Sequence, residues 1–149
     1  MFVEDYVKII EEEFSYLFDR YGFKVVYSEQ KNNNKYRAGI ESKICKILFV
    51  REQGAGVIYL GPPTAPFLNE FGNSWIEIAN LIMYLTQEKI DWNKVDKYKG
   101  ENRIRPIMKL LANIFEPHCP KALEMFSSNE MIARWRPMYK QYIRQVYSG

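Results

Sequence analysis

The chain has 149 residues, 47% of them hydrophobic and 26% charged, which is the composition of a compact globular domain. This balance excludes wholesale disorder and fibrous repeats. The apolar runs fall far short of the ~20 residues that a membrane-spanning helix needs, so we expect no membrane segment. With two cysteines and no leader segment at its start, the sequence indicates a cytoplasmic protein.

Charge is distributed unevenly along the chain. The formal net charge is +3, yet residues 1–30 carry three basic and seven acidic side chains, whereas residues 102–149 carry eight basic and three acidic ones. We therefore expect an acidic and a basic region on the molecule. Aromatic residues reach 15%, and because such side chains gather at interfaces as well as in cores, they give the first indication of a binding surface.

The first predicted element is a helix over residues 3–21, where apolar residues recur at three- and four-residue steps. Gly22 follows the last of them, and a glycine at that place readily ends a helix in the left-handed conformation. From Phe23 the period changes to two, with Phe23, Val25 and Tyr27 on one side. Together with turn residues farther on, this pattern predicts an antiparallel meander of about four strands up to residue 61.

The third predicted strand, over residues 44–51, is apolar on both faces. Its side chains divide into two sets, Cys45, Ile47 and Phe49 on one side and Ile44, Leu48 and Val50 on the other. A strand of this kind needs cover on both faces. We expect the first helix to cover one face and a later helix or a partner to cover the other, and a homodimer through the sheet or the following loop is therefore a prediction.

A loop with three prolines, residues 61–72, follows the sheet. A helix is then predicted from Ser74, because Glu77 three residues later completes a capping box and Trp75 begins an apolar stripe. The loop itself carries Phe67 and Phe71, and stiff aromatic loops suit partner docking because little entropy is lost on binding. The competing interpretation is that these two rings close the open end of the sheet.

The rest of the chain is expected to be mainly helical. After a charged connector at 91–100, apolar spacing predicts a helix over 104–115. A last helix is predicted to start near Ser127 and run toward Tyr147, with Pro137 kinking or restarting it. The fold class is thus α+β: an N-terminal helix, a meander of about four strands and C-terminal helices. We expect a single domain over 1–149, with helix plus sheet in 1–61 and mainly helices in 73–149.

No combination of residues predicts catalysis, a metal site or a cofactor. The only histidine is His118, and its neighbour Cys119 is an unsuitable partner because adjacent side chains seldom reach each other. Cys45 alternates with apolar residues on a strand, where a free cysteine behaves as a small apolar side chain. Gly54 and Gly56 fit a hairpin turn rather than a phosphate loop, since strands flank them on both sides.

The last helix carries the most specific candidate site. Arg136, Lys140 and Arg144 recur at four-residue steps, which places three cations in one row, with Arg134 and Trp135 close by. Such a row suits a phosphate backbone or an acidic protein. The alternative is a solvated helix face whose Trp135 packs on the core.

Three segments carry a family resemblance: Phe18–Glu29, with its Tyr-Gly-Phe at the end of a helix, Ile47–Gly54, and Val57–Gly61. Over roughly the first 90 residues the chain resembles small uncharacterised bacterial α+β proteins, some of them similar to immunity proteins of toxin systems. The resemblance implies a cytoplasmic, non-catalytic protein whose surface binds another protein. The charge departs from that pattern, because inhibitors of nucleases tend to be acidic and this chain is net positive.

The sequence therefore predicts a non-catalytic protein-interaction module, an immunity-type or regulatory inhibitor with a protein partner. The alternative from another class is a nucleic-acid-binding accessory protein that uses the C-terminal basic helix. The expected binding residues are Phe67, Phe71, Arg134, Trp135, Arg136, Lys140 and Arg144.

Overall fold

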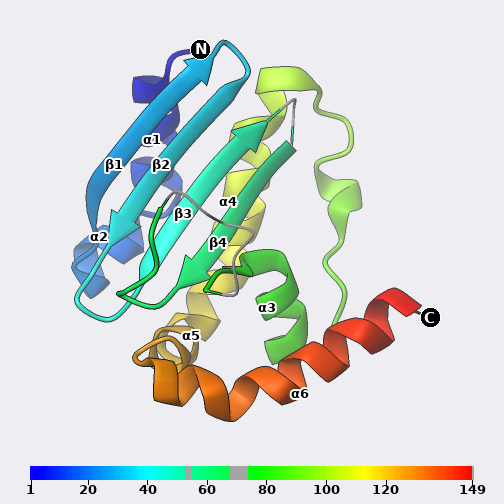
Figure 1. Ribbon diagram of the computed structural model, residues 1–149. Coiled ribbons are helices and arrows are strands. Elements are labelled where there is room, and N and C mark those ends of the chain that lie inside the picture. The colour runs from blue at the N-terminus through cyan, green and yellow to red at the C-terminus, as the bar shows by residue number, and fades with distance from the viewer. Residues whose placement is uncertain (53–54, 68–73, 149) are drawn as a thin grey trace.

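The computed structural model describes residues 1–52, 55–67 and 74–148. The fold class is α+β, as predicted, and the sheet has five antiparallel strands in the order β1-β2-β3-β4-β5 (Figure 1). The strands are β1 Lys24–Asn32, β2 Lys35–Glu41, β3 Lys46–Glu52, β4 Ala55–Gly61 and β5 Ile76–Glu77. The α-helices are α1 Val3–Glu13, α2 Ser15–Tyr21, α3 Ile78–Thr86, α4 Ile104–Phe115, α5 Cys119–Met125 and α6 Asn129–Ser148.

The predicted N-terminal helix is two helices with a break at Phe14. Phe14 leaves the helical conformation at φ −106° and ψ 31°, although its N–H still donates to the Ile10 carbonyl. After this irregularity Tyr16 turns into the core, where its hydroxyl donates to the Ala112 carbonyl of α4 at 2.7 Å. Gly22 ends α2 in the left-handed conformation at φ 70°, as predicted.

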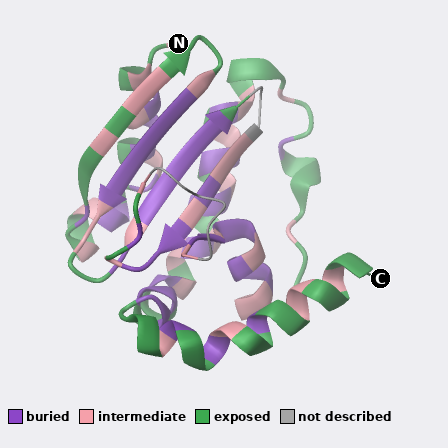
Figure 2. Ribbon diagram, viewed as in Figure 1, coloured by how far each residue is buried: buried purple, intermediate pink, exposed green. Residues whose placement is uncertain are grey.

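One face of the sheet packs on helices. The alternation in β2 is confirmed, since Tyr36, Ala38 and Ile40 are all buried on this face. The same buried face extends into β3, because Ile40 pairs with Ile47 and Ala38 with Phe49 across the two strands. Helices α1 and α4 cover this face and contact each other, which forms the main core (Figure 2).

Among the described residues, extended segments rather than a helix lie on the other face of the sheet, which differs from the predicted later helix. Leu48 and Val50 instead pack against Ala65 and Trp75, residues of the segments that precede and follow the undescribed residues 68–73. Phe67 joins this small second cluster. Because these segments bury the apolar face of β3, the reason for expecting a dimer through that face no longer holds.

Two glycines let aromatic rings lie flat on this outer face. A Cβ at Gly39 would lie 2.5 Å from Cε1 of Phe67, and one at Gly61 would lie 2.7 Å from Cε3 of Trp75. The Phe67 ring also stacks on Tyr27, with centroids 5.7 Å apart and planes at 2°. Only glycine allows so close an approach between a strand and a ring.

The backbone of the covering segment is held by three side chains of the sheet. Lys46 Nζ donates to the Ala65 carbonyl at 2.9 Å, Trp75 Nε1 to the Pro66 carbonyl at 3.0 Å, and Arg37 Nη2 to the Phe67 carbonyl at 2.8 Å. The carbonyls of three successive residues thus each accept a hydrogen bond, and the donors come from β3, from the residue before β5 and from β2. This segment is therefore part of the folded structure and not a protruding loop.

The predicted helix at Ser74 begins four residues later than expected. Residues Ile76 and Glu77 pair with β4 instead, Leu60 opposite Ile76, and α3 starts at Ile78 without a side-chain cap. The capping box at Ser74 is therefore wrong, and so is the assignment of Trp75 to the helix stripe. Trp75 lies on the opposite face of the sheet because the extended backbone of β5 turns its side chain away from α3.

Strand β1 is the edge of the sheet and is mostly exposed. Val25 and Val26 are 36% and 46% exposed. The predicted common side for Phe23, Val25 and Tyr27 is wrong, because Phe23 lies in the main core and Tyr27 stacks on Phe67 of the outer face. A register shift between Val25 and Tyr27 marks an irregularity that breaks the alternation. Phe23 is buried just before the strand begins.

The C-terminal helices follow the prediction closely. Helix α4 has the predicted bounds, α5 adds a short helix after it, and α6 continues through Pro137 with a bend visible in Figure 1. Ser128, one residue later than predicted, caps α6, because its Oγ accepts the Met131 N–H at 3.0 Å.

Candidate interaction surface

Helix α6 forms one side of the molecule and packs against α3 and α5 (Figure 1). Its buried side chains are Ile132, Trp135 and Tyr139, spaced three and four residues apart on one face. Burial raises the pKa of Tyr139 to about 12, which agrees with its place under the helix. Toward the C-terminal end, the Tyr147 hydroxyl donates to Asn80 Oδ1 of α3 at 2.7 Å.

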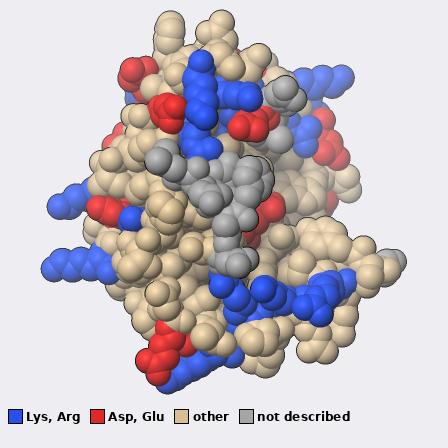
Figure 3. Space-filling view, viewed as in Figure 1, with Lys and Arg blue, Asp and Glu red and all other residues tan. Residues whose placement is uncertain are grey.

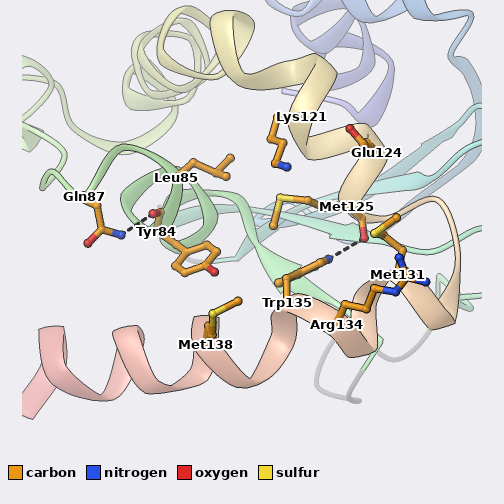
Figure 4. A pocket seen from close by; sticks show the side chains of 10 residues that line it. All are labelled: Tyr84, Leu85, Gln87, Lys121, Glu124, Met125, Met131, Arg134, Trp135 and Met138. Carbon is orange, nitrogen blue, oxygen red and sulfur yellow. Dashed lines mark hydrogen bonds between the residues drawn. The ribbon is translucent and has the colours of Figure 1, made fainter.

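A methionine groove lies on one side of this buried stripe, between α3, α5 and α6 (Figure 4). Its volume is about 500 Å³. It is lined by Tyr84, Leu85, Gln87, Lys121, Glu124, Met125, Met131, Arg134, Trp135 and Met138. In Figure 4 the Met138 side chain comes from α6 and the Tyr84 ring from α3, on facing walls.

Side-chain hydrogen bonds fix the walls of the methionine groove. The Trp135 indole donates to the Met125 carbonyl at 2.8 Å, which joins α6 to α5, and Gln87 Nε2 donates to the Tyr84 carbonyl at 2.7 Å (Figure 4). Met138 is 59% exposed, whereas Trp135 in the same groove is 7% exposed. Flexible thioethers on firm walls suit apolar side chains of different shapes.

A basic hollow lies on the other side of the buried stripe of α6. Its volume is about 540 Å³. It is lined by Pro62, Ser74, Asn129, Ile132, Ala133, Arg136, Pro137, Lys140 and Arg144. Figure 3 shows Lys and Arg side chains gathered along α6. The predicted row of cations is thus brought together in one concavity.

The other candidate residues have different places. Arg134 and Trp135 belong to the methionine groove, where Arg134 pairs with Glu130 one turn earlier at 3.3 Å and Trp135 is only 7% exposed. Phe67 lies half-buried on the outer face of the sheet, between Tyr27 and Trp75, so its binding role stays a prediction. Phe71 lies outside the described residues.

Sequence reasoning missed the methionines. Met131 and Met138 are seven residues apart and share one side of α6 with Arg134 and Trp135, so their spacing was available as a signal. Met125 joins them from α5, and only the tertiary structure shows that proximity.

The two cysteines both lie in the main core. Cys45 and Cys119 are fully buried and free, and burial raises the pKa of both thiols, that of Cys119 to about 12. Thiols of this kind are inert, since the thiolate is the reactive form. Among the described residues no group of three or more His, Cys, Asp or Glu side chains is placed to hold a metal ion.

Comparison with protein-family models, with curated protein sequences and with solved structures finds no match. Within the described part of the chain, no helix combines the length and the apolar character needed to cross a membrane.

Proposed function

We propose that this protein is a non-catalytic protein-interaction module that docks its partner on the methionine groove. The single observation that carries the proposal is the groove itself, an open apolar concavity of about 500 Å³ whose most exposed large apolar side chain is Met138 at 59%. Large apolar side chains left exposed beside a firm concavity are typical of surfaces that bury them in a complex. The family resemblance extends the proposal to a cytoplasmic immunity-type or regulatory inhibitor.

The interaction energy available at this surface can be bounded from Met138. Full burial of a methionine side chain stabilises by roughly 1.5–3 kcal/mol, and 59% of this residue is still exposed. Seating it in a partner therefore contributes about 1–2 kcal/mol, or roughly a tenfold change in affinity. Because the Trp135 and Met125 walls are already formed, little ordering is needed on binding.

The proposal is tested by comparing three forms of the protein as bait in a lysate of its source organism. Met138→Lys places a charge over the groove, whereas Met138→Leu keeps an apolar side chain of similar volume. We expect a partner that quantitative mass spectrometry finds with wild type and Met138→Leu and does not find with Met138→Lys. For the purified partner, calorimetry should show binding to Met138→Lys weakened by about tenfold or more.

Equal recovery of every captured protein by Met138→Lys and wild type would contradict the proposal. Since Met138 is exposed, the substitution should leave the free energy of unfolding nearly unchanged, which urea denaturation checks. A binding defect is then assigned to the groove and not to unfolding.

The second candidate function is nucleic-acid binding, and one observation favours it: three cations at four-residue steps line a single hollow. Each phosphate that they contact would release condensed counterions, so the logarithm of the binding constant should fall with log salt by roughly 0.9 per duplex contact. Replacing all three by Gln should then flatten that slope by about three contacts. An unchanged slope, or no binding to duplex at low salt, would exclude this candidate.

A further inference from the structure

The methionine groove carries a projection and a hollow on the same surface. Met138 projects from α6 with 59% of its surface exposed, and it borders a concavity of about 500 Å³. In Figure 4 Met138 lies toward one end of the groove and Met131 toward the other. A surface of this kind can be complementary to itself, as the interface between two copies related by a twofold axis requires.

The charges on the rim of the methionine groove are also self-complementary. Lys121 and Glu124 line the groove from α5, and both are exposed. They lie three residues apart and therefore on one face of the helix. Neither forms an ion pair with any residue that the structure describes, and they do not pair with each other. The third charged residue of the described lining, Arg134, already pairs with Glu130 at 3.3 Å.

One acidic and one basic group on the same rim restrict the occupant. A partner segment of a single charge would be attracted by one of them and repelled by the other. Two α5 helices that run antiparallel across a twofold axis instead place Lys121 of each copy opposite Glu124 of the other. Both charges are then paired, and the pair is formed twice, because each contact of such an interface occurs in both directions. The charges of the rim therefore fit a second copy of this chain.

We infer that two copies of this chain dock on each other through the methionine groove, with Met138 of each copy seated at the Met131 end of the other's groove. Lys121 of each copy pairs with Glu124 of the other. Flexible thioethers allow one surface to receive either a second copy or a different protein, so self-association and partner binding exclude each other. This competition rests on the proposed function, whereas the dimer itself does not.

Sedimentation velocity from low micromolar to near-millimolar concentration tests the dimer. Met138→Lys puts a charge into the apolar contact. Lys121→Glu and Glu124→Lys each place like charges opposite each other, and the double variant restores the pair with its signs exchanged. The control, Lys109→Glu, makes the same change of charge at an exposed position of α4 outside the groove. Circular dichroism and urea denaturation establish that all variants fold.

We expect wild type and the control to form the same concentration-dependent dimer. Met138→Lys should raise its dissociation constant about a hundredfold, because a loss of roughly tenfold at one contact occurs twice. Each single charge variant should raise it about tenfold, since two exposed ion pairs are lost and like charges replace them. The double variant should return it to within about threefold of the wild-type value.

Wild type that stays monomeric at near-millimolar concentration would overturn the inference. So would a dimer that Met138→Lys does not weaken, because it would form through another surface. A double variant that associates as weakly as the single charge variants would overturn it as well, since Lys121 would then not face Glu124 of the other copy.

The dimer and the proposed function fail separately. If wild type dimerises as expected while Met138→Lys captures every protein as wild type does, the groove joins two copies and is not the docking site of a partner. If wild type stays monomeric while Met138→Lys loses its partner, the groove is a docking site that a second copy does not occupy. Where both hold, the apparent affinity for the purified partner should fall as the concentration of this chain rises, and an affinity independent of concentration would overturn the competition.

Discussion

Gly39→Ala tests the unexpected cover on the outer face of the sheet. Gly39 has an ordinary strand conformation, so the substitution introduces no backbone strain. The added Cβ would lie 2.5, 2.7 and 2.9 Å from three atoms of the Phe67 ring, well inside the ~3.5–4.0 Å of a normal carbon contact. The ring must therefore move by about 1 Å or more.

Several contacts oppose that movement. Phe67 is stacked on Tyr27, its ring lies 5.0 Å from Lys46 Nζ, and its carbonyl accepts a hydrogen bond from Arg37. Overpacking of this kind costs about 1–3 kcal/mol of unfolding free energy. Gly56→Ala is the matched control, because a Cβ there meets nothing within 4 Å, and it should stabilise by about 0.5 kcal/mol.

Urea denaturation measures both effects as shifts of the midpoint at constant m value. A double-mutant cycle isolates the contact: in a Phe67→Ala background the clash is absent, so Gly39→Ala should cost less than about 0.5 kcal/mol. If Gly39→Ala is as harmless as Gly56→Ala in the wild-type background, Phe67 does not lie over Gly39 and the outer face must be covered in another way.

Three further predictions follow from buried polar groups. The Tyr6 hydroxyl is fully buried with no hydrogen-bond partner among the described residues. Urea denaturation of Tyr6→Phe should therefore show a free energy of unfolding that is unchanged or up to about 1 kcal/mol higher than that of wild type. A clearly lower free energy of unfolding would mean that the hydroxyl makes a hydrogen bond. Burial raises the pKa of Glu77 above its ordinary value of 4.5, so stability is lost as pH rises from that value through the raised one, and Glu77→Gln should be more stable than wild type at pH 7 but not at pH 3; equal pH profiles would contradict this. Burial also raises the pKa of Cys45 and Cys119, so neither thiol should react with a disulfide reagent at pH 8 until the protein unfolds, and rapid native-state labelling would refute it.

The features that the sequence predicts well are those with a local physical cause. The left-handed Gly22 and the helix over 104–115 depend on residues close together in the chain, and both are confirmed. The alternation at Tyr36, Ala38 and Ile40 is confirmed for the same reason, since a two-residue period on a central strand directly reports one buried face.

The failures share a non-local cause. Ser74 and Glu77 have the spacing of a capping box, but pairing with β4 keeps Ile76 and Glu77 extended, so tertiary contact overrides the local signal. Phe23, Val25 and Tyr27 alternate as one side of a regular strand would, yet β1 is an edge strand with a register shift between Val25 and Tyr27. No local pattern indicates that Phe67 and Trp75 cover the sheet, because the cover depends on glycines in other strands.

In the candidate site, too, the local features could be predicted from the sequence and the tertiary ones could not. The row of Arg136, Lys140 and Arg144 follows from helical spacing alone, whereas its enclosure in a hollow depends on Pro62 and Ser74, which the sheet brings to α6. Trp135 illustrates the consequence: it was a candidate for binding, and the structure uses its ring to fill the core and its N–H to join α6 to α5.

Different residues of α6 serve stability and binding, so substitutions can change one without the other. The stripe with Trp135 and Tyr139 holds the helix to the core, so substitutions there would disturb the fold and both concavities together. Met138 and Lys140 lie on opposite sides of the stripe and are exposed, so each reports on one concavity with little effect on the core. A partner that spans α6 would contact both concavities, and the affinity losses from Met138→Lys and Lys140→Gln should then add, since the two concavities have no lining residue in common.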